Sequence, residues 1–137
     1  MICIDAAVAL AAVIHNDPDH TVALNYLANL AAENITLCAP ALFRYECDAV
    51  IRLQVYRGTL NGAQATTALS LIDALGVVLE FDVSNSDRTY EIATEYIQPR
   101  AYDAAYAAHA ESRGIDFVTI DSPYGDGIVT EWTSSRY

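Results

Sequence analysis

The chain has 137 residues, a formal net charge of −11 and a hydrophobic fraction of 53%. This length suits a single domain with its own core, and the apolar fraction excludes wholesale disorder. All basic residues are Arg, and the absence of Lys excludes a P-loop for nucleotide phosphates. An acidic chain of this kind attracts nucleic acid only where cations offset its carboxylates.

The amino-terminal stretch and the cysteines indicate a cytoplasmic protein. No apolar run approaches the roughly 18 residues of a membrane span. The start, "MICIDAAVAL", has no basic residue and carries Asp5 inside its apolar stretch, so we do not expect a signal peptide. Cys3, Cys38 and Cys47 form no CxxC pair and are odd in number, which favours buried, reduced thiols.

Short apolar strands alternate with helical patterns along the chain. In chain order we expect a strand over 1–4, helices over 6–15 and 21–34, a strand over 35–40, helices over 41–56 and 61–76, a strand over 77–81, helices over 86–97 and 103–113, a strand over 117–120 and a shorter strand near 127–132. Gly76 suits a helix C-cap and Ser86 an N-cap. The alternation predicts one α/β domain over residues 1–137, with a central parallel sheet of four to five strands flanked by helices.

Carboxylates stand at the ends of several of these elements. Asp5 and Asp121 follow the first and fourth strands, and Asp103 begins the last helix. Each has an ordinary explanation: a helix cap for Asp5, a favourable first-turn charge for Asp103 and a turn for Asp121. If the first and fourth strands are neighbours, however, their ends meet at the crevice where such folds bind ligands. Acids packed together repel one another, so their convergence favours a divalent-cation site.

Glu46 lies on the helix expected over 41–56. A helical wheel at about 100° per residue places Phe43, Val50 and Leu53 within roughly 60° of it, and Arg44 and Asp48 on the opposite side. The wheel therefore predicts that Glu46 lies in the middle of the apolar stripe, where a charge needs a partner. The structural alternative is a buried Glu satisfied by an Arg or by backbone groups; the functional one is a carboxylate aimed into an acidic pocket.

Several other polar residues are weaker candidates. Thr119 shares a strand face with Asp121, so its hydroxyl can orient a carboxylate, although a β-forming residue in a strand is equally expected. Asp126 can assist or replace Asp121. The cluster "HNDPDH" (residues 15–20) fits a polar loop better than a zinc site. His109 shares a helix face with Tyr102 and Tyr106, which favours a packed histidine.

These stretches resemble the PIN-domain ribonucleases, in particular the VapC-type toxins of prokaryotic toxin–antitoxin pairs. "ICIDAAV" is similar to the family's first strand and acid, and "APALFRYECDAVIRL" to the segment that carries its Glu. "YDAAYAAHAESRGIDFVTID" is the most specific match. The resemblance implies a three-layer PIN-like fold. It also implies a catalytic and metal-binding set of Asp5, Glu46, Asp103 and Asp121, with Thr119 as the accompanying hydroxyl.

The same resemblance implies Mg²⁺ or Mn²⁺ as cofactor and single-stranded RNA as substrate. It further implies a small antitoxin as partner, and a homodimer. An inhibitor suited to this acidic site is expected to carry an Arg-bearing tail. Ala7 and Ala49 replace residues that are often polar in the family, so a PIN-like interaction module with weak or no activity remains an alternative. A haloacid-dehalogenase-like phosphatase is excluded, because Ala7 stands where a second Asp is needed and Lys is absent.

Overall fold

The computed structural model describes residues 1–120 and 130–132. Within them a five-stranded sheet has the order β3-β2-β1-β4-β5. The strands are β1 (Ile2–Ile4), β2 (Leu37–Pro40), β3 (Val78–Glu80), β4 (Asp116–Thr119) and β5 (Thr130–Trp132). The first four are parallel, as predicted, but β5 pairs antiparallel with β4. The predicted parallel sheet of four to five strands therefore holds for its first four strands. The fifth is antiparallel, since only residues 120–129 separate it from β4 and a parallel crossover needs a dozen or more residues.

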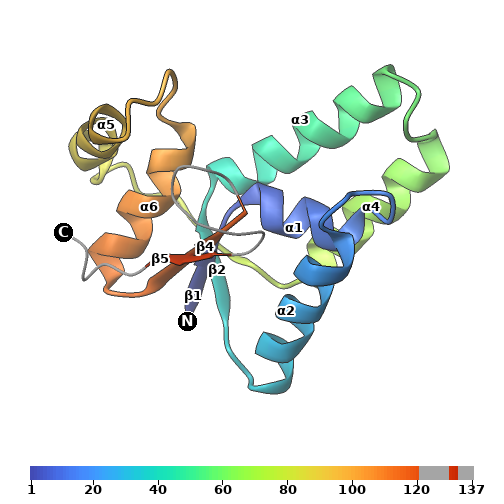
Figure 1. Cartoon of the computed structure of the whole chain (residues 1–137), viewed down its shortest axis with the longest axis horizontal. Helices are drawn as coiled ribbons and strands as arrows, with labels where there is room; N and C mark the ends of the chain where they lie inside the picture. Colours follow the sequence, from blue (N-terminus) through green and yellow to red (C-terminus); the bar gives the residue numbers. More distant parts are fainter. Residues whose placement is uncertain (121–129, 133–137) are drawn as a thin grey trace.

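Helices cover both faces of the sheet, which gives the three-layer arrangement that was expected (Figure 1). One layer contains the first four helices and the other contains the last two. The helices are α1 (Ala6–Val13), α2 (His20–Ala32), α3 (Leu42–Tyr56), α4 (Gly62–Ala74), α5 (Ser86–Glu95) and α6 (Tyr102–Arg113). α1 packs against α2, α3 and α4, while α5 packs against α6 and α6 against three of the strands. None of the helices in the described ranges is long and apolar enough to cross a bilayer.

The core follows from the composition of two elements. α1 is built from Ala, Val and Leu and is buried on nearly all sides, as expected for a helix that is apolar all round. α6 contributes Ala104, Tyr106 and Ala108 to the opposite layer, and the Tyr106 ring stacks on Phe117 of β4 with centroids 6.1 Å apart. Cys3, Cys38 and Cys47 are buried free thiols, which confirms the prediction.

Two helix ends test the capping predictions. Gly76 has φ +65° and directly follows Leu75, the C-cap of α4, which confirms its role as a C-terminal stop. Ser86 is wrong as an N-cap, because it is already the first helical residue and Asn85 occupies the cap position without a side-chain hydrogen bond to the helix. Another local pattern decides where the chain turns into α5: Ser84 hydrogen-bonds to Asp82 and forms a turn just before the helix.

The strand order creates a switch point beside β1. The chain proceeds from β1 outwards through β2 and β3, and then returns to place β4 on the other side of β1. Ile4 lies opposite Val118 in this parallel pair, so the residues that follow, Asp5 and Thr119, lie side by side at the carboxyl edge. Ligands of open α/β sheets bind in the crevice at such a point.

Candidate active site

Asp5 is held rigidly at the start of α1. It is 2% exposed, and its Oδ1 accepts a hydrogen bond of 3.0 Å from the backbone N–H of Val8. Its Oδ2 accepts a 2.5 Å hydrogen bond from the hydroxyl of Thr119, which is fully buried. The N-cap explanation and the site explanation are therefore compatible, because one carboxylate oxygen caps α1 and the other accepts the hydrogen bond from Thr119 of β4.

Glu46 lies at the border of the buried face of α3, not in its middle. The buried residues of this helix are Phe43, Cys47 and Ile51, whereas Val50 and Leu53 are 36% and 41% exposed. The predicted stripe was centred on the wrong part of the helix surface, because the fold leaves the apolar side chains of Val50 and Leu53 exposed. Glu46 is half-buried.

Asp103 lies in the first turn of α6, which begins one residue earlier than predicted, at Tyr102. The side chain is half-buried, and this burial raises the pKa of its carboxyl above the ordinary value. A carboxyl with this shift gains from a nearby cation, which favours its ionised form.

A single cavity of about 350 Å³ brings these acids together. Asp5, Glu46 and Asp103 all line it, together with Ile120, which directly follows β4. No Arg is among the described residues that line it. Arg44 pairs instead with Asp48 and Asp73 on the outer side of α3 and α4. The structure thus gathers three of the four predicted acids around one strongly acidic hollow.

The fourth predicted acid, Asp121, and its possible assistant Asp126 lie outside the described residues. Ile120 is the last described residue that lines this side of the cavity, and the neighbouring Thr119 hydrogen-bonds to Asp5. Asp121 therefore stays a prediction, supported by its place two residues after Thr119 at the end of β4.

Asp17 also lines this cavity, although the sequence pattern placed it only in a polar loop and not with the other acids. It comes from the loop between α1 and α2, where its Oδ1 accepts a 2.8 Å hydrogen bond from the backbone N–H of Asp19. The "HNDPDH" stretch was correctly interpreted as a polar loop, since His20 begins α2 and bonds to the carbonyl of Ala11. No spacing in the sequence shows that this loop folds back beside Glu46, because that approach depends on the packing of α1 against α3.

Tyr106 lies close to these acids. It is fully buried, and burial raises the pKa of its hydroxyl far above the usual range, with the charges of Glu46 and Asp5 adding to the effect. The tyrosine therefore stays protonated. His109 is buried too, as predicted, but Tyr102 is 58% exposed and does not share its packed face.

The donor set suits a hard cation. Carboxylate oxygens are the ligands that Mg²⁺ and Mn²⁺ prefer, and Mg²⁺ keeps several waters while using one or two carboxylates directly. Within the part of the chain that the structure describes, no three potential ligand side chains are close enough to hold one ion between them. The described acids therefore fit a hydrated cation held by few direct bonds better than a closed cage.

A profile of the PIN domain family matches residues 2–124. This chain belongs to the PIN domain family. Both the predicted resemblance and the three-layer α/β fold are thereby confirmed. The match spans every element from β1 to β4, so it includes Asp5, Glu46 and Asp103, which line the acidic cavity.

Solved structures share the fold of this PIN domain. PAE2754 from Pyrobaculum aerophilum is 24% identical over 88% of this chain and 74% of its own, with a TM-score of 0.62. VapC20 from Mycobacterium tuberculosis, a toxin that cleaves the sarcin-ricin loop, is 17% identical over 90% of this chain and 92% of its own, with a TM-score of 0.66. A search of curated proteins finds no match.

Proposed function

We propose that this PIN-domain protein is a metal-dependent endoribonuclease that cleaves single-stranded RNA in the cytoplasm, and that it is the toxin of a type II toxin–antitoxin pair. The observation that carries the proposal is the Asp5 carboxylate, fixed by Val8 and Thr119 in a cavity that Glu46 and Asp103 also line. Family membership and the fold shared with VapC20 support a nuclease of this kind.

The residues divide the work according to their surroundings. Asp5 and Asp121 would hold Mg²⁺ or Mn²⁺ directly, because Asp5 is pre-oriented by two hydrogen bonds and Asp121 follows the neighbouring strand. When bound, the cation lowers the pKa of an attacking water and offsets charge on the phosphate. Asp103 would ligate the cation or hold one of its waters, and Glu46 would ligate it or position the attacking water. Thr119 is a positioning residue for Asp5.

The acidity of the cavity explains why the cation is needed for binding of the RNA substrate as well as for its cleavage. Four described carboxylates, those of Asp5, Asp17, Glu46 and Asp103, line one hollow. An RNA phosphate entering it meets like charge unless a divalent ion offsets these acids. Substrate affinity is therefore expected to depend on the metal, in addition to the rate of cleavage.

The decisive experiment is a cleavage assay on a pool of unstructured RNA, with Mn²⁺ or Mg²⁺ and then with a chelator. Cleavage that requires the cation and is lost in Glu46→Gln supports the nuclease. Correct folding and metal binding without cleavage would favour the alternative, a PIN-like interaction module. Ala7, which lines the cavity, and the exposed Ala49 are the positions that make this alternative worth testing.

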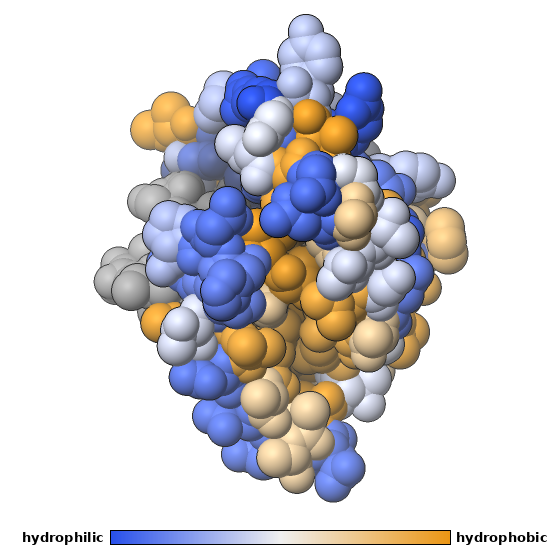
Figure 2. Space-filling view, turned by 90° about the vertical axis from the view of Figure 1, so that its right-hand side faces the viewer, coloured by the Kyte–Doolittle hydropathy of each residue, from blue (hydrophilic) through white to orange (hydrophobic). Residues whose placement is uncertain are grey.

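A partner protein is the second part of the proposal. Figure 2 shows apolar residues gathered in the middle of the end of the molecule where α3 and α4 lie. Val50, Leu53 and Tyr56 of α3 and Leu71 of α4 are exposed apolar side chains. A patch of this kind suits a protein interface, either with a second copy or with an antitoxin.

The antitoxin is expected to carry at least one Arg that enters the acidic cavity in place of the metal, because the planar guanidinium pairs bidentately with carboxylates. Its tail and Mn²⁺ should then compete. Calorimetric titration of the tail, with and without saturating Mn²⁺, tests this arrangement. Equal affinities in the two conditions would show that inhibition does not work through the acids.

A further inference from the structure

A second cavity, of about 380 Å³, lies between the ends of β2 and β3 and the helices α5 and α6. Its volume falls within the usual range for small-ligand sites. It shares no lining residue with the acidic cavity. Among its lining residues are Pro40, Leu42, Glu80, Phe81, Asn85 and His109.

His109 gives this cavity a buried polar group that the proposed chemistry does not use. The residue is 3% exposed, and among the described residues its Nε2 has no hydrogen-bond partner. The Glu80 carboxylate is 3.9 Å away and is itself paired with Arg113. A buried ring nitrogen without a partner is costly, so a ligand that bonds to it gains more than the same bond would give in water.

Phe81 provides a surface of the opposite character. Its side chain is 81% exposed at the rim, and Pro40, Leu42 and Ala105 add apolar walls. A flat ligand with an apolar face and a hydrogen-bonding edge satisfies both parts of the cavity. An aliphatic side chain of a partner protein would fill the apolar part and leave the His109 nitrogen unsatisfied.

The two cavities are neighbours along α3. Leu42 lines the second cavity and Glu46 lines the acidic one, and residues four apart lie on the same face of a helix, about 6 Å along its axis. The second cavity is therefore within reach of a nucleotide adjacent to a phosphate that is bound at the acids.

The charges around the second cavity are mixed. Glu80 is offset by Arg113, and Asp82, which also lines the cavity, is exposed to the screening solvent. Both α3 and α5 begin at this cavity; α5 carries Asp87 in its first turn, whereas α3 has no acid there and no side-chain cap. The start of α3 is therefore positively polarised and favours the phosphate attached to a bound base.

We propose that the cavity between β3, α5 and α6 is a nucleobase pocket for single-stranded RNA, in which the base stacks on Phe81 and hydrogen-bonds to His109. The inference rests on the proposed ribonuclease function and names its specificity site. Stacking on an aromatic side chain with hydrogen bonds to the base edge is the usual way in which proteins read unpaired bases.

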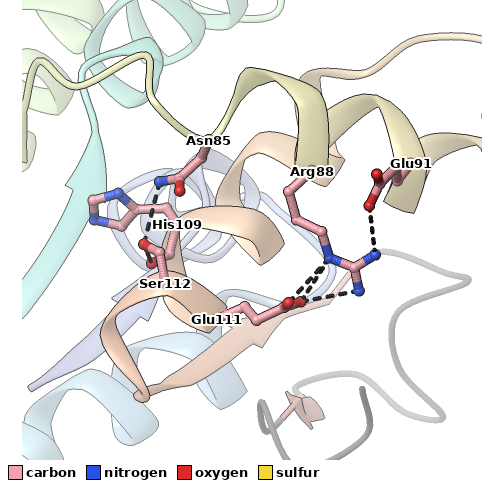
Figure 3. A network of polar contacts seen from close by, with 6 residues as sticks. All are labelled: Asn85, Arg88, Glu91, His109, Glu111 and Ser112. Carbon is pink, nitrogen blue, oxygen red and sulfur yellow. Dashed lines mark hydrogen bonds and ion pairs between the residues drawn. The ribbon is translucent and has the colours of Figure 1, made fainter.

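Polar contacts between α5 and α6 hold one wall of this pocket (Figure 3). Arg88 of α5 bonds to both carboxylate oxygens of Glu111 on α6, and also pairs with Glu91. Nearer the pocket, Asn85 donates to the Ser112 hydroxyl. The His109 ring projects away from the Arg88–Glu111 pair in Figure 3, so these contacts brace the helices without occupying the pocket.

The test uses the full chain, labelled with ¹³C and ¹⁵N, in a chelating buffer so that the acidic cavity plays no part. AMP, GMP, CMP and UMP are titrated separately while the ring signals of His109 and Phe81 are followed by NMR. At least one nucleotide should shift both signals saturably. Phe81→Ala should weaken that binding roughly 5- to 150-fold, as expected for the loss of one stacked base. Tyr90→Ala, which removes another exposed aromatic ring outside the pocket, should leave it unchanged.

A second arm sequences the cut sites in a randomised RNA pool with Mn²⁺. Phe81→Ala should flatten the base preference at one position near the cut, and Tyr90→Ala should not. If the wild-type chain cuts nothing, the nuclease proposal fails while the nucleotide titration still decides the pocket. If none of the four nucleotides shifts His109 or Phe81, the pocket inference is overturned. Saturable shifts with N-acetylleucinamide alone would overturn it as well, and would assign the cavity to a protein partner.

Discussion

The hydrogen bond from Thr119 to Asp5 offers the sharpest test of how the acidic site is built. Replacing Thr119 with Val keeps the shape of the side chain and removes the hydroxyl that donates to Asp5 Oδ2. Both residues are buried, so this oxygen loses a hydrogen bond that solvent does not replace. Hydrogen bonds to charged groups contribute about 1.5–3 kcal/mol to the free energy of unfolding. For a domain of this size, such a loss lowers Tm by roughly 5–12 °C.

Thr119→Ser is the matched control, because it keeps the hydroxyl and deletes one methyl group. It should cost about 1 kcal/mol through lost burial. Urea unfolding in a chelating buffer, followed by circular dichroism, should therefore rank the wild type first, Ser second and Val last. The metal adds an independent reading: residues that orient a metal ligand typically change metal affinity by about 10- to 100-fold. We expect that loss in calorimetric Mn²⁺ titrations of the Val variant and not of the Ser variant. A Val variant as stable as the wild type, with unchanged Mn²⁺ affinity, would refute the positioning role of Thr119.

Three further predictions concern the acids. Mn²⁺ should raise Tm relative to a chelating buffer, by an amount equivalent to about 2.7 kcal/mol at a concentration 100 times its Kd; no shift in a thermal melt would contradict a shared cation site. Glu46→Gln should abolish RNA cleavage and leave the urea midpoint equal or higher, because it removes a charge from a half-buried position; full activity would remove Glu46 from the site. Burial raises the pKa of Asp103, so in the metal-free protein its ionisation is less favourable folded than unfolded. The metal-free protein should therefore lose stability as pH rises through the ordinary Asp pKa towards the raised one, and Asp103→Asn should remove this part of the pH dependence and reduce Mn²⁺ binding. Urea midpoints measured across that pH range in chelating buffer check this, and identical pH profiles for the two proteins would contradict it.

The sequence by itself determined the order of elements and the positions of the acids. Strands and helices follow from local periodicity and from helix stops such as Gly76, which the structure places at φ +65°. The PIN-domain resemblance was likewise carried by short local stretches, and the family match over residues 2–124 confirms it. Asp5 and Asp103 were identifiable because each stands at the start of a helix. The local sequence shows where such a helix begins, and so indicates the edge of the sheet at which the carboxylate lies.

Only the tertiary structure decided which groups meet. The Asp5–Thr119 bond joins residues 114 positions apart, and it depends on β1 and β4 being neighbours in register. Glu46 was misplaced within its stripe because a helical wheel shows which residues share a face, while the packing of α3 against its neighbours decides which face is buried. The approach of Asp17 to the acids and the second cavity around His109 have the same origin. They arise from contacts between elements distant in the chain, and such contacts leave no local pattern in the sequence.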